Sequence, residues 1–320
     1  MACKLLNIES MYKSPQCFGL IALLSALTMT TGCVADDATS DAEAGAEVDL
    51  DPESNGVDIN GRDVNGRDVN GRDVNGRDVN GIMLDKSQIS AIHTDGTISS
   101  GSALIGMELD TTTSDGKAVT LRIDNVEEEP SFYNGELIHM YTISTKSKKN
   151  KSWVPLCGAD ASGVAVRSVP LQGRWDYRQG VPGGGSKIDD PDFLTFACEG
   201  YTLQKCVRLG YEPWRTVNGT LLSDHHQACV RLHRADYCGD GRSFTMDGML
   251  INLYDDLGVQ SDTESWVFEA EWTTEGARCV SSPRISGKKY TPTCAFEIPA
   301  ADCGKSIDWS VTLLANEQEQ

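Results

Sequence analysis

The distribution of cysteines constrains the fold of this 320-residue chain more than any other feature. Three of its eleven cysteines lie at or before residue 33, and the other eight all follow residue 150: Cys157, Cys198, Cys206, Cys229, Cys238, Cys279, Cys294 and Cys303. An even set of this kind, in a chain that leaves the cytosol, is typical of a disulfide framework. Zinc is the alternative, but no Cys-x-x-Cys pair occurs, and zinc sites favour such short spacings. We therefore expect up to four disulfides and no metal site.

A short helix is predicted in the segment 223–241, and it ends in a glycine-rich, acidic turn. Its apolar residues recur at three- and four-residue steps, the spacing of one buried face: Ala228, Cys229, Leu232 and Ala235. Ser223 or Asp224 would cap its start, and Gly239 would close its end in the left-handed conformation.

Helix geometry restricts how the cysteines pair. Nine residues separate Cys229 from Cys238, which in one helix places them about 13 Å apart, whereas a disulfide needs Cα atoms within about 7 Å. The same argument separates Cys198 from Cys206 if one helix includes both. We expect these four cysteines to join different elements, for example Cys206 to Cys229 or to Cys238, which would staple two helices. Local pairing is easier for the cysteines of the turn-rich end: Cys279, Cys294 and Cys303.

The rest of the chain from about residue 82 indicates short strands joined by turns. Apolar or alternating runs mark them at 89–92, 104–109, 119–123, 138–143, 164–169, 173–177, 193–198 and 268–272. A second short helix is predicted from Leu203 to Leu209, capped by Thr202 and ended by Gly210. We predict an α+β fold: a β-rich antiparallel domain with two or three short helices, stabilised by disulfides. We divide it into a β-meander at 82–150, a disulfide-bearing domain at 151–310 and a C-terminal tail at 311–320.

The N-terminus predicts export and lipid anchoring. Lys4 and Lys13 precede an apolar run at 17–27, which is too short to span a bilayer but suits a signal peptide. The run is followed by Thr30-Thr31-Gly32-Cys33, which resembles a bacterial lipobox. The resemblance implies a signal peptide at 1–32 and diacylglyceryl attachment to Cys33, which would anchor the chain by burying lipid methylenes. Val34 rather than Asp after the lipidated cysteine favours the outer membrane over the inner membrane.

Two further segments separate the predicted anchor from the strands. Residues 33–54 are acidic, lack aromatic residues and are expected to be a disordered tether. Residues 55–81 carry the pentad Asn-Gly-Arg-Asp-Val, which resembles the pentapeptide-repeat family but places arginine where that family has a small inward residue. Too few copies are present to stack a solenoid. We predict an extended spacer, with a short strand-like segment docked on the next domain as the alternative.

Several motifs in the same order resemble the ADYC domain family. They are Ala235-Asp236-Tyr237-Cys238, the segment 206–214, and Phe268–Trp272 followed by Gly276–Cys279. The resemblance covers about residues 153–279 and assigns the domain at 151–310 to this family. It implies a bacterial, mostly myxobacterial, envelope lipoprotein, and the family has no established activity.

Candidate chemical groups surround the same motif. His225, Cys229 and His233 share a helical stripe, but a catalytic cysteine needs a free thiol, so Cys229 is expected in a disulfide and the histidines on an exposed flank. Asp236 and Asp240 adjoin glycine turns, which suits calcium or an acid–base pair, although aspartate also caps helices and forms turns. Two aromatic residues would form either a ligand platform or part of the core: Trp214 and Tyr237.

The function that follows is a lipid-anchored cell-envelope protein, most simply a non-enzymatic binding or structural module with a protein or glycan ligand. The alternative is an envelope hydrolase or a calcium-dependent, lectin-like protein that uses the turn at Asp236 and Asp240. A net charge of −19 without a basic patch excludes nucleic acid as a partner. No catalytic residue and no cofactor other than calcium is suggested by the sequence.

Overall fold

The computed structural model describes residues 57–59, 66–70, 75–76, 79–146 and 151–319. The chain divides into two units, residues 1–43 and 44–320, and every described residue belongs to the second. The predicted signal peptide, the lipidation site Cys33 and the acidic tether therefore lie outside the described residues.

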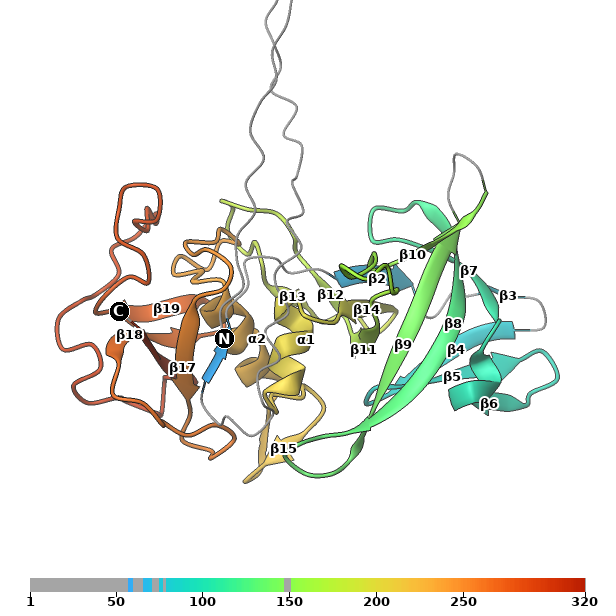
Figure 1. The fold of residues 1–320 in the computed structure, drawn as a ribbon, viewed down its shortest axis with the longest axis horizontal. Coiled ribbons are helices and arrows are strands. Elements are labelled where there is room, and N and C mark those ends of the chain that lie inside the picture. Colours follow the sequence, from blue (N-terminus) through green and yellow to red (C-terminus); the bar gives the residue numbers. More distant parts are fainter. Residues whose placement is uncertain (1–56, 60–65, 71–74, 77–78, 147–150, 320) are drawn as a thin grey trace, which may run out of the picture. The chain divides into compact units, whose positions relative to one another are not determined.

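The second unit contains an 11-stranded sheet in the order β2-β14-β11-β9-β8-β7-β3-β4-β5-β6, with β10 paired to β9 (Figure 1). Its strands are β2 (Gly66–Asn70), β3 (Asn75–Gly76), β4 (Val79–Asp85), β5 (Gln88–His93), β6 (Ile98–Ser100), β7 (Glu108–Thr112), β8 (Ala118–Pro130), β9 (Leu137–Lys146), β10 (Trp153–Pro155), β11 (Ser168–Gln172) and β14 (Phe193–Cys198), with the 3-10 helix η1 (Gly101–Leu104) after β6. Alternate residues of the long hairpin β8–β9 face a first hydrophobic core, including Leu121, Ile123, Tyr141 and Ile143.

This sheet crosses the predicted boundary at residue 150. Strand β9 pairs with β8 on one side and with β10 and β11 on the other, where Tyr141 lies opposite Ser168. The division into a β-meander at 82–150 and a separate domain at 151–310 is therefore wrong. The meander would leave the backbone of β9 unpaired at an edge, and later strands supply the missing hydrogen bonds.

A five-stranded antiparallel sheet has the order β1-β17-β20-β18-β19. Its strands are β1 (Val57–Ile59), β17 (Leu250–Tyr254), β18 (Val267–Thr273), β19 (Gly276–Val280) and β20 (Leu314–Gln318). The predicted tail at 311–320 is wrong, because β20 lies between β17 and β18 and pairs with both. Leu314 and Ala315 are fully buried, so the last apolar residues of the chain complete the core of this sheet. Two small ribbons complete the strands: β12 (Arg174–Trp175) with β13 (Lys187–Ile188), and β15 (Thr216–Val217) with β16 (Thr220–Leu221).

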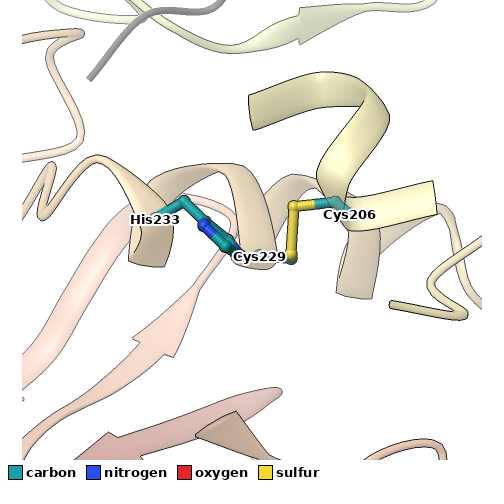
Figure 2. Close-up of side chains that lie close together, drawn as sticks. All are labelled: Cys206, Cys229 and His233. Atoms are coloured by element: carbon teal, nitrogen blue, oxygen red, sulfur yellow. A yellow bond between two sulfur atoms is a disulfide. The ribbon is translucent and has the colours of Figure 1, made fainter. Parts of the chain in front are cut away.

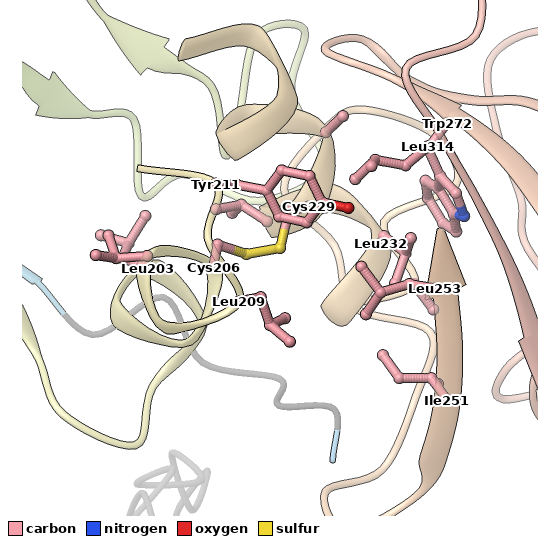
Figure 3. Packing of buried hydrophobic residues seen from close by; sticks show 14 of the residues in the cluster. Leu203, Cys206, Leu209, Tyr211, Cys229, Leu232, Ile251, Leu253, Trp272 and Leu314 are labelled. Atoms are coloured by element: carbon pink, nitrogen blue, oxygen red, sulfur yellow. A yellow bond between two sulfur atoms is a disulfide. The ribbon is translucent and has the colours of Figure 1, made fainter. Parts of the chain in front are cut away.

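Two α-helices occur in the described residues, α1 (Thr202–Arg208) and α2 (Ser223–His233). They pack against each other; α1 also contacts β14, and α2 contacts β18, β19 and β20. A second, larger hydrophobic core surrounds them (Figure 3), and it includes Leu203 of α1, Leu232 of α2 and Leu253 of the five-stranded sheet, the last two lying side by side. The helices therefore connect the two sheets, and the predicted α+β, antiparallel fold is confirmed.

The predicted helix ends differ from the structure. Thr202 and Ser223 are the first helical residues, and the caps before them are Tyr201 and Leu222, neither of which makes a side-chain capping hydrogen bond. The left-handed residue closest to the end of α2 is Ala235, with φ of 49°; Gly239 is also left-handed, with φ of 63°, but it lies six residues after the last helical residue, His233. Gly239 is required for another reason: a Cβ there would lie 1.7 Å from the Glu275 carbonyl oxygen.

All eight cysteines after residue 150 form disulfides: Cys157–Cys198, Cys206–Cys229, Cys238–Cys294 and Cys279–Cys303. The predicted separation of Cys229 from Cys238 is confirmed, and Cys206–Cys229 is one of the two bridges that were expected to staple the helices. Cys279–Cys303 is the local pair expected of the turn-rich segment. Cys294 instead reaches Cys238, 56 residues away, so it ties that segment to the end of α2.

The pentad repeat supplies strands to both sheets in its described parts. Strand β1 pairs with β17, β2 pairs with β14, and β3 pairs with β7. These residues are extended, but they are paired in the sheets and not an unattached spacer, so for them the docked-strand alternative holds. The pentad strands pair here because β14 and β17 would otherwise present unpaired backbone groups at a sheet edge.

Candidate functional site

The Ala235–Cys238 motif lies directly after α2, where the chain reverses. The left-handed conformation of Ala235 lets the Asp236 amide donate to the Arg231 carbonyl at 2.9 Å. The Ala277 amide of β19 then donates to the Tyr237 carbonyl at 3.0 Å. All four motif residues are buried. The motif therefore joins the end of the helix to the five-stranded sheet.

Asp236 forms a fully buried ion pair with Arg231 of α2. Its carboxylate also accepts hydrogen bonds from the amides of Gly241 at 3.0 Å and Asp240 at 3.2 Å. Burial raises the pKa of Asp236 above its ordinary value, and the positive charges of Arg231 and Arg234 act in the opposite direction. Every Asp236 oxygen is thus already used within the protein, with the ion pair offsetting only part of the cost of burying the charge.

The guanidinium of Arg231 extends this contact to two further segments. It donates to the Gly184 carbonyl at 2.6 Å, the Ser186 hydroxyl at 2.7 Å and the Thr274 carbonyl at 3.1 Å. Gly185 is packed so closely that a Cβ there would lie 2.6 Å from Arg231 Nη1. The Arg231–Asp236 pair therefore holds the glycine run at 183–185 and the β18–β19 turn against α2.

Tyr237 belongs to a second buried network. Its hydroxyl donates to Glu269 Oε1 at 2.9 Å and accepts from the Arg284 amide at 2.8 Å. Arg284 binds both oxygens of Glu269, each at 2.9 Å, and donates to the last carbonyls of α2, those of Leu232 and His233. Burial raises the pKa of Tyr237 well above its ordinary range, with the Glu269 charge acting in the same direction. The Tyr237 ring also stacks on Trp272 with ring centroids 5.4 Å apart, so of the two predicted interpretations it belongs to the core.

Asp240 does not join Asp236 in a shared, open site. Its carboxylate accepts three hydrogen bonds from the Arg242 guanidinium, the shortest at 2.6 Å, and one from the Arg242 amide, and its side chain is 16% exposed. Each of the two aspartates therefore holds a different arginine. This arrangement favours the turn-forming interpretation of both residues over a shared calcium or acid–base site.

The histidines of α2 are buried, which corrects the expectation that His225 and His233 lie on an exposed flank. Helix α2 is covered by α1 on one side and by β18–β20 on another, so it has no wide polar face. Burial lowers the pKa of His225, His226 and His233, the last of them well below its ordinary value. These side chains are therefore neutral at pH 7.

One of these histidines lies beside a disulfide (Figure 2). The ligand atoms of Cys206, Cys229 and His233 all lie within 4.8 Å of one another. The two sulfurs are bonded to each other, and only a thiolate acts as nucleophile or metal ligand. The cluster therefore supports neither the Cys–His dyad nor a zinc site in this oxidised form. The same holds for Glu271 with Cys279 and Cys303, whose sulfurs are also bonded.

An open recess lies elsewhere, at the junction of three segments. It has a volume of about 420 Å³, and its lining comes from the β4–β5 turn, the β8–β9 turn and the segment after α1: Lys86, Asn134, Glu136, Trp214, Arg215, Thr216 and Val217. Lys86 Nζ contacts Glu136 Oε2 at 2.6 Å, with both side chains about half exposed. That hydrogen bond raises the pKa of Lys86. The recess therefore presents charged and aromatic side chains to solvent, unlike the motif.

Glu212 is a buried acid near this recess. Ser131 donates a hydrogen bond to its Oε1, whereas its Oε2 is buried and receives none from the described residues. Burial is the main cause that raises the pKa of Glu212, and the charges of Arg215, Glu136 and Lys86 also act on it. Glu212 is therefore electrostatically coupled to three of the residues that line the recess.

The sequence signalled only one residue of this recess, Trp214. Its other lining residues come from turns that are distant in the sequence and meet only in the fold. A signal for Glu212 exists, since it is a carboxylate between Tyr211 and Pro213 within a motif shared with a known family.

Comparison with known proteins gives one match. A family model described as the ADYC domain matches residues 101–286, more than half of the chain. The match begins inside the predicted meander at 82–150, earlier than the motifs at 153–279 had indicated. This agrees with the sheet that spans the predicted meander and the predicted domain at 151–310. No curated protein and no solved structure matches the chain.

No helix in the part of the chain that the structure describes is long and apolar enough to cross a bilayer.

Proposed function

The chain belongs to the ADYC domain family, and from this premise we propose that it is a lipid-anchored cell-envelope protein with a non-enzymatic binding module. Its attachment to the membrane is through diacylglyceryl at Cys33, in the outer membrane of a bacterial envelope. Its ligand is a protein or a glycan.

The observation that carries the proposal is that the Ala235–Cys238 motif is buried and its polar groups are bonded within the protein. The polar groups of Asp236 and Tyr237 are buried and engaged in holding α2 against its neighbours. A catalytic acid, base or nucleophile must reach a substrate, and these groups do not. The four disulfides support the compartment, because such bonds persist outside the reducing cytosol. The lipobox-like Thr30-Thr31-Gly32-Cys33 supports the anchor.

The anchor is tested by expressing the full chain in bacteria that process lipoproteins and labelling the cells with an alkyne-bearing fatty acid. We expect label on the wild-type protein, loss of label and release from membranes for Cys33→Ser, and no effect for the control Cys17→Ser in the leader. Label that persists on Cys33→Ser, or an unlabelled wild-type protein, contradicts the anchor.

Thermal melting of the full chain distinguishes the proposed module from the alternative, a calcium-dependent site at Asp236 and Asp240. We expect the same Tm with millimolar calcium as with EDTA, because both carboxylates already bind arginines. A calcium-dependent rise in Tm that Asp240→Asn removes favours the calcium-dependent lectin or hydrolase instead.

A further inference from the structure

The geometry points to the recess lined by Lys86, Trp214 and Arg215 as a binding site for a saccharide that carries a carboxylate. This inference rests on the proposed binding function and deepens it, because it names the site and the chemical class of the ligand. The site is distinct from the ADYC motif, whose polar groups face inward.

Size is the first argument. At about 420 Å³, the recess lies within the usual range of small-molecule sites, roughly 300–1,000 Å³. Its lining is more polar than that of most small-molecule sites, with two apolar side chains, Trp214 and Val217, beside five polar or charged ones. The aromatic residue is Trp214, which packs partly against the larger core and is held in place by it. A flat aromatic surface beside amide and hydroxyl groups, here Asn134 and Thr216, suits the apolar face and hydroxyls of a sugar ring.

Charge is the second argument, and it selects an acidic ligand. The recess has two cations, Lys86 and Arg215, against one half-exposed anion, Glu136. The lining therefore carries one more positive than negative side chain, in a chain whose net charge is −19. A cationic concavity concentrates anions, and the planar fork of one guanidinium matches a single carboxylate.

Arg215 is the residue that would hold the carboxylate. Its Nη1 donates to the Gly210 carbonyl at 3.1 Å, and its guanidinium lies 5.8 Å from the centre of the Tyr133 ring. These contacts fix the plane of the guanidinium and use one of its five N–H donors, which leaves a planar fork for a carboxylate. Lys86 is already paired with Glu136, so an incoming carboxylate competes with Glu136 for that ammonium.

The test is isothermal titration calorimetry of the full-length mature protein in detergent at pH 7. The probes are a trimer of galacturonic acid, the neutral galactose trimer and an acetylated triglutamate peptide. We expect the galacturonate trimer to bind at least tenfold more tightly than the galactose trimer, because a charge-assisted pair contributes roughly that much. We expect no binding of the peptide, which lacks a sugar face.

Two variants assign the binding to the recess. Arg215→Gln should weaken galacturonate binding about tenfold or more and leave galactose binding unchanged. The matched control is Arg208→Gln, an exposed arginine at the end of α1 that is outside the recess, and it should change neither. If Arg215→Gln does not fold, Lys86→Gln on an exposed turn takes its place, with the same expected direction.

Equal affinity for the charged and neutral trimers overturns the proposal that the ligand carries a carboxylate. Binding of the peptide alone overturns the proposal that the ligand is a saccharide. Absence of binding by the folded protein overturns the site. None of these results depends on lipid at Cys33, which the labelling experiment tests separately, so failure of this inference is distinguishable from failure of the proposed function.

Discussion

Replacing Glu269 with glutamine is the most direct test of the claim that the motif is a structural lock. Glu269 and Arg284 are both fully buried, and the guanidinium contacts both carboxylate oxygens at 2.9 Å. Glutamine keeps the size and one carbonyl oxygen but removes the charge. Arg284 cannot lose its proton, so the variant leaves a positive charge in the core with only carbonyl acceptors, those of Leu232 and His233 among them.

The magnitude follows from burial. Removing one partner of a buried ion pair costs about 3–5 kcal/mol, because the remaining charge is uncompensated. Tyr237 and Asn316 also donate to the Glu269 carboxylate, and one of these donors would face an NH₂ group in the variant, so we expect the upper part of that range.

The protein contains a matched control in Glu199→Gln. Glu199 also receives two hydrogen bonds from one guanidinium, that of Arg167, at 2.8 and 2.6 Å. These side chains are 33% and 25% exposed, and Arg167 contacts Glu127 and Glu129 as well. A solvent-exposed pair contributes about 0–1 kcal/mol. Both substitutions replace a carboxylate that binds an arginine, but Arg167 is partly exposed and keeps two other carboxylates, whereas Arg284 is buried and loses the carboxylate that it binds.

The assay is equilibrium urea unfolding of the unreduced protein at pH 7, with the free energy of unfolding taken by linear extrapolation. We expect Glu269→Gln to lose at least 2 kcal/mol more than Glu199→Gln, by the ranges above. Equal losses for the two variants would refute the reasoning, since burial would then make no difference. In that case the motif would have to be explained by something other than stability.

Three further predictions follow from the structure. Burial raises the pKa of Glu212 above its unfolded value of 4.5, so the stability that its neutral form contributes is complete below pH 4.5 and is lost as the pH rises through the native pKa. Glu212→Gln should therefore raise the Tm at pH 8 and give no advantage at pH 4. A difference in Tm that does not change with pH contradicts this prediction. Removing the Cys206–Cys229 bridge with a double alanine variant should lower the free energy of unfolding by about 3 kcal/mol, from the 23-residue separation it closes, and an unchanged urea midpoint would show that the bridge constrains little. Gly239→Ala should destabilise by at least about 1 kcal/mol more than Gly183→Ala, because both glycines have positive φ but only Gly239 lies against a backbone oxygen; equal melting temperatures would exclude that close approach.

Local patterns in the sequence were sufficient to predict several elements. The strand Phe193–Cys198 has the predicted bounds, and the first helix lies within one residue of its predicted position. The second helix begins within two residues of its predicted start but ends at His233, several residues before the predicted end at Gly239. Cys229 and Cys238 do not pair, as predicted, although Cys238 lies beyond the end of the helix to which both were assigned. The predicted strand at 104–109 was interrupted, because Gly106 adopts φ of 86° between η1 and β7. An apolar run does not report such a turn unless glycine is read as a break.

Tertiary packing decided what the local patterns could not. Nothing in the last residues of the chain distinguishes a tail from β20, because the strand exists only where β17 and β18 provide partners on both sides. In the same way, the three-residue β1 has no local reason to be a strand and is explained by the edge of β17.

The motif shows why polar residues in a sequence are poor guides to a site. Asp236, Tyr237 and the buried histidines were natural candidates for chemistry because acids, phenols and imidazoles dominate catalytic sites. The same groups also satisfy the carbonyls and amides that a helix leaves unpaired at its end, and in this protein Arg284 and Asp236 do that for the last turn of α2 and the reversal after it. Only burial distinguishes a polar group that acts in catalysis from one that pairs the backbone groups at a helix end. A buried, fully paired polar cluster specifies one packing of the core, whereas a partly exposed one such as the recess is available to a ligand. In this chain the Ala-Asp-Tyr-Cys residues therefore hold the fold together.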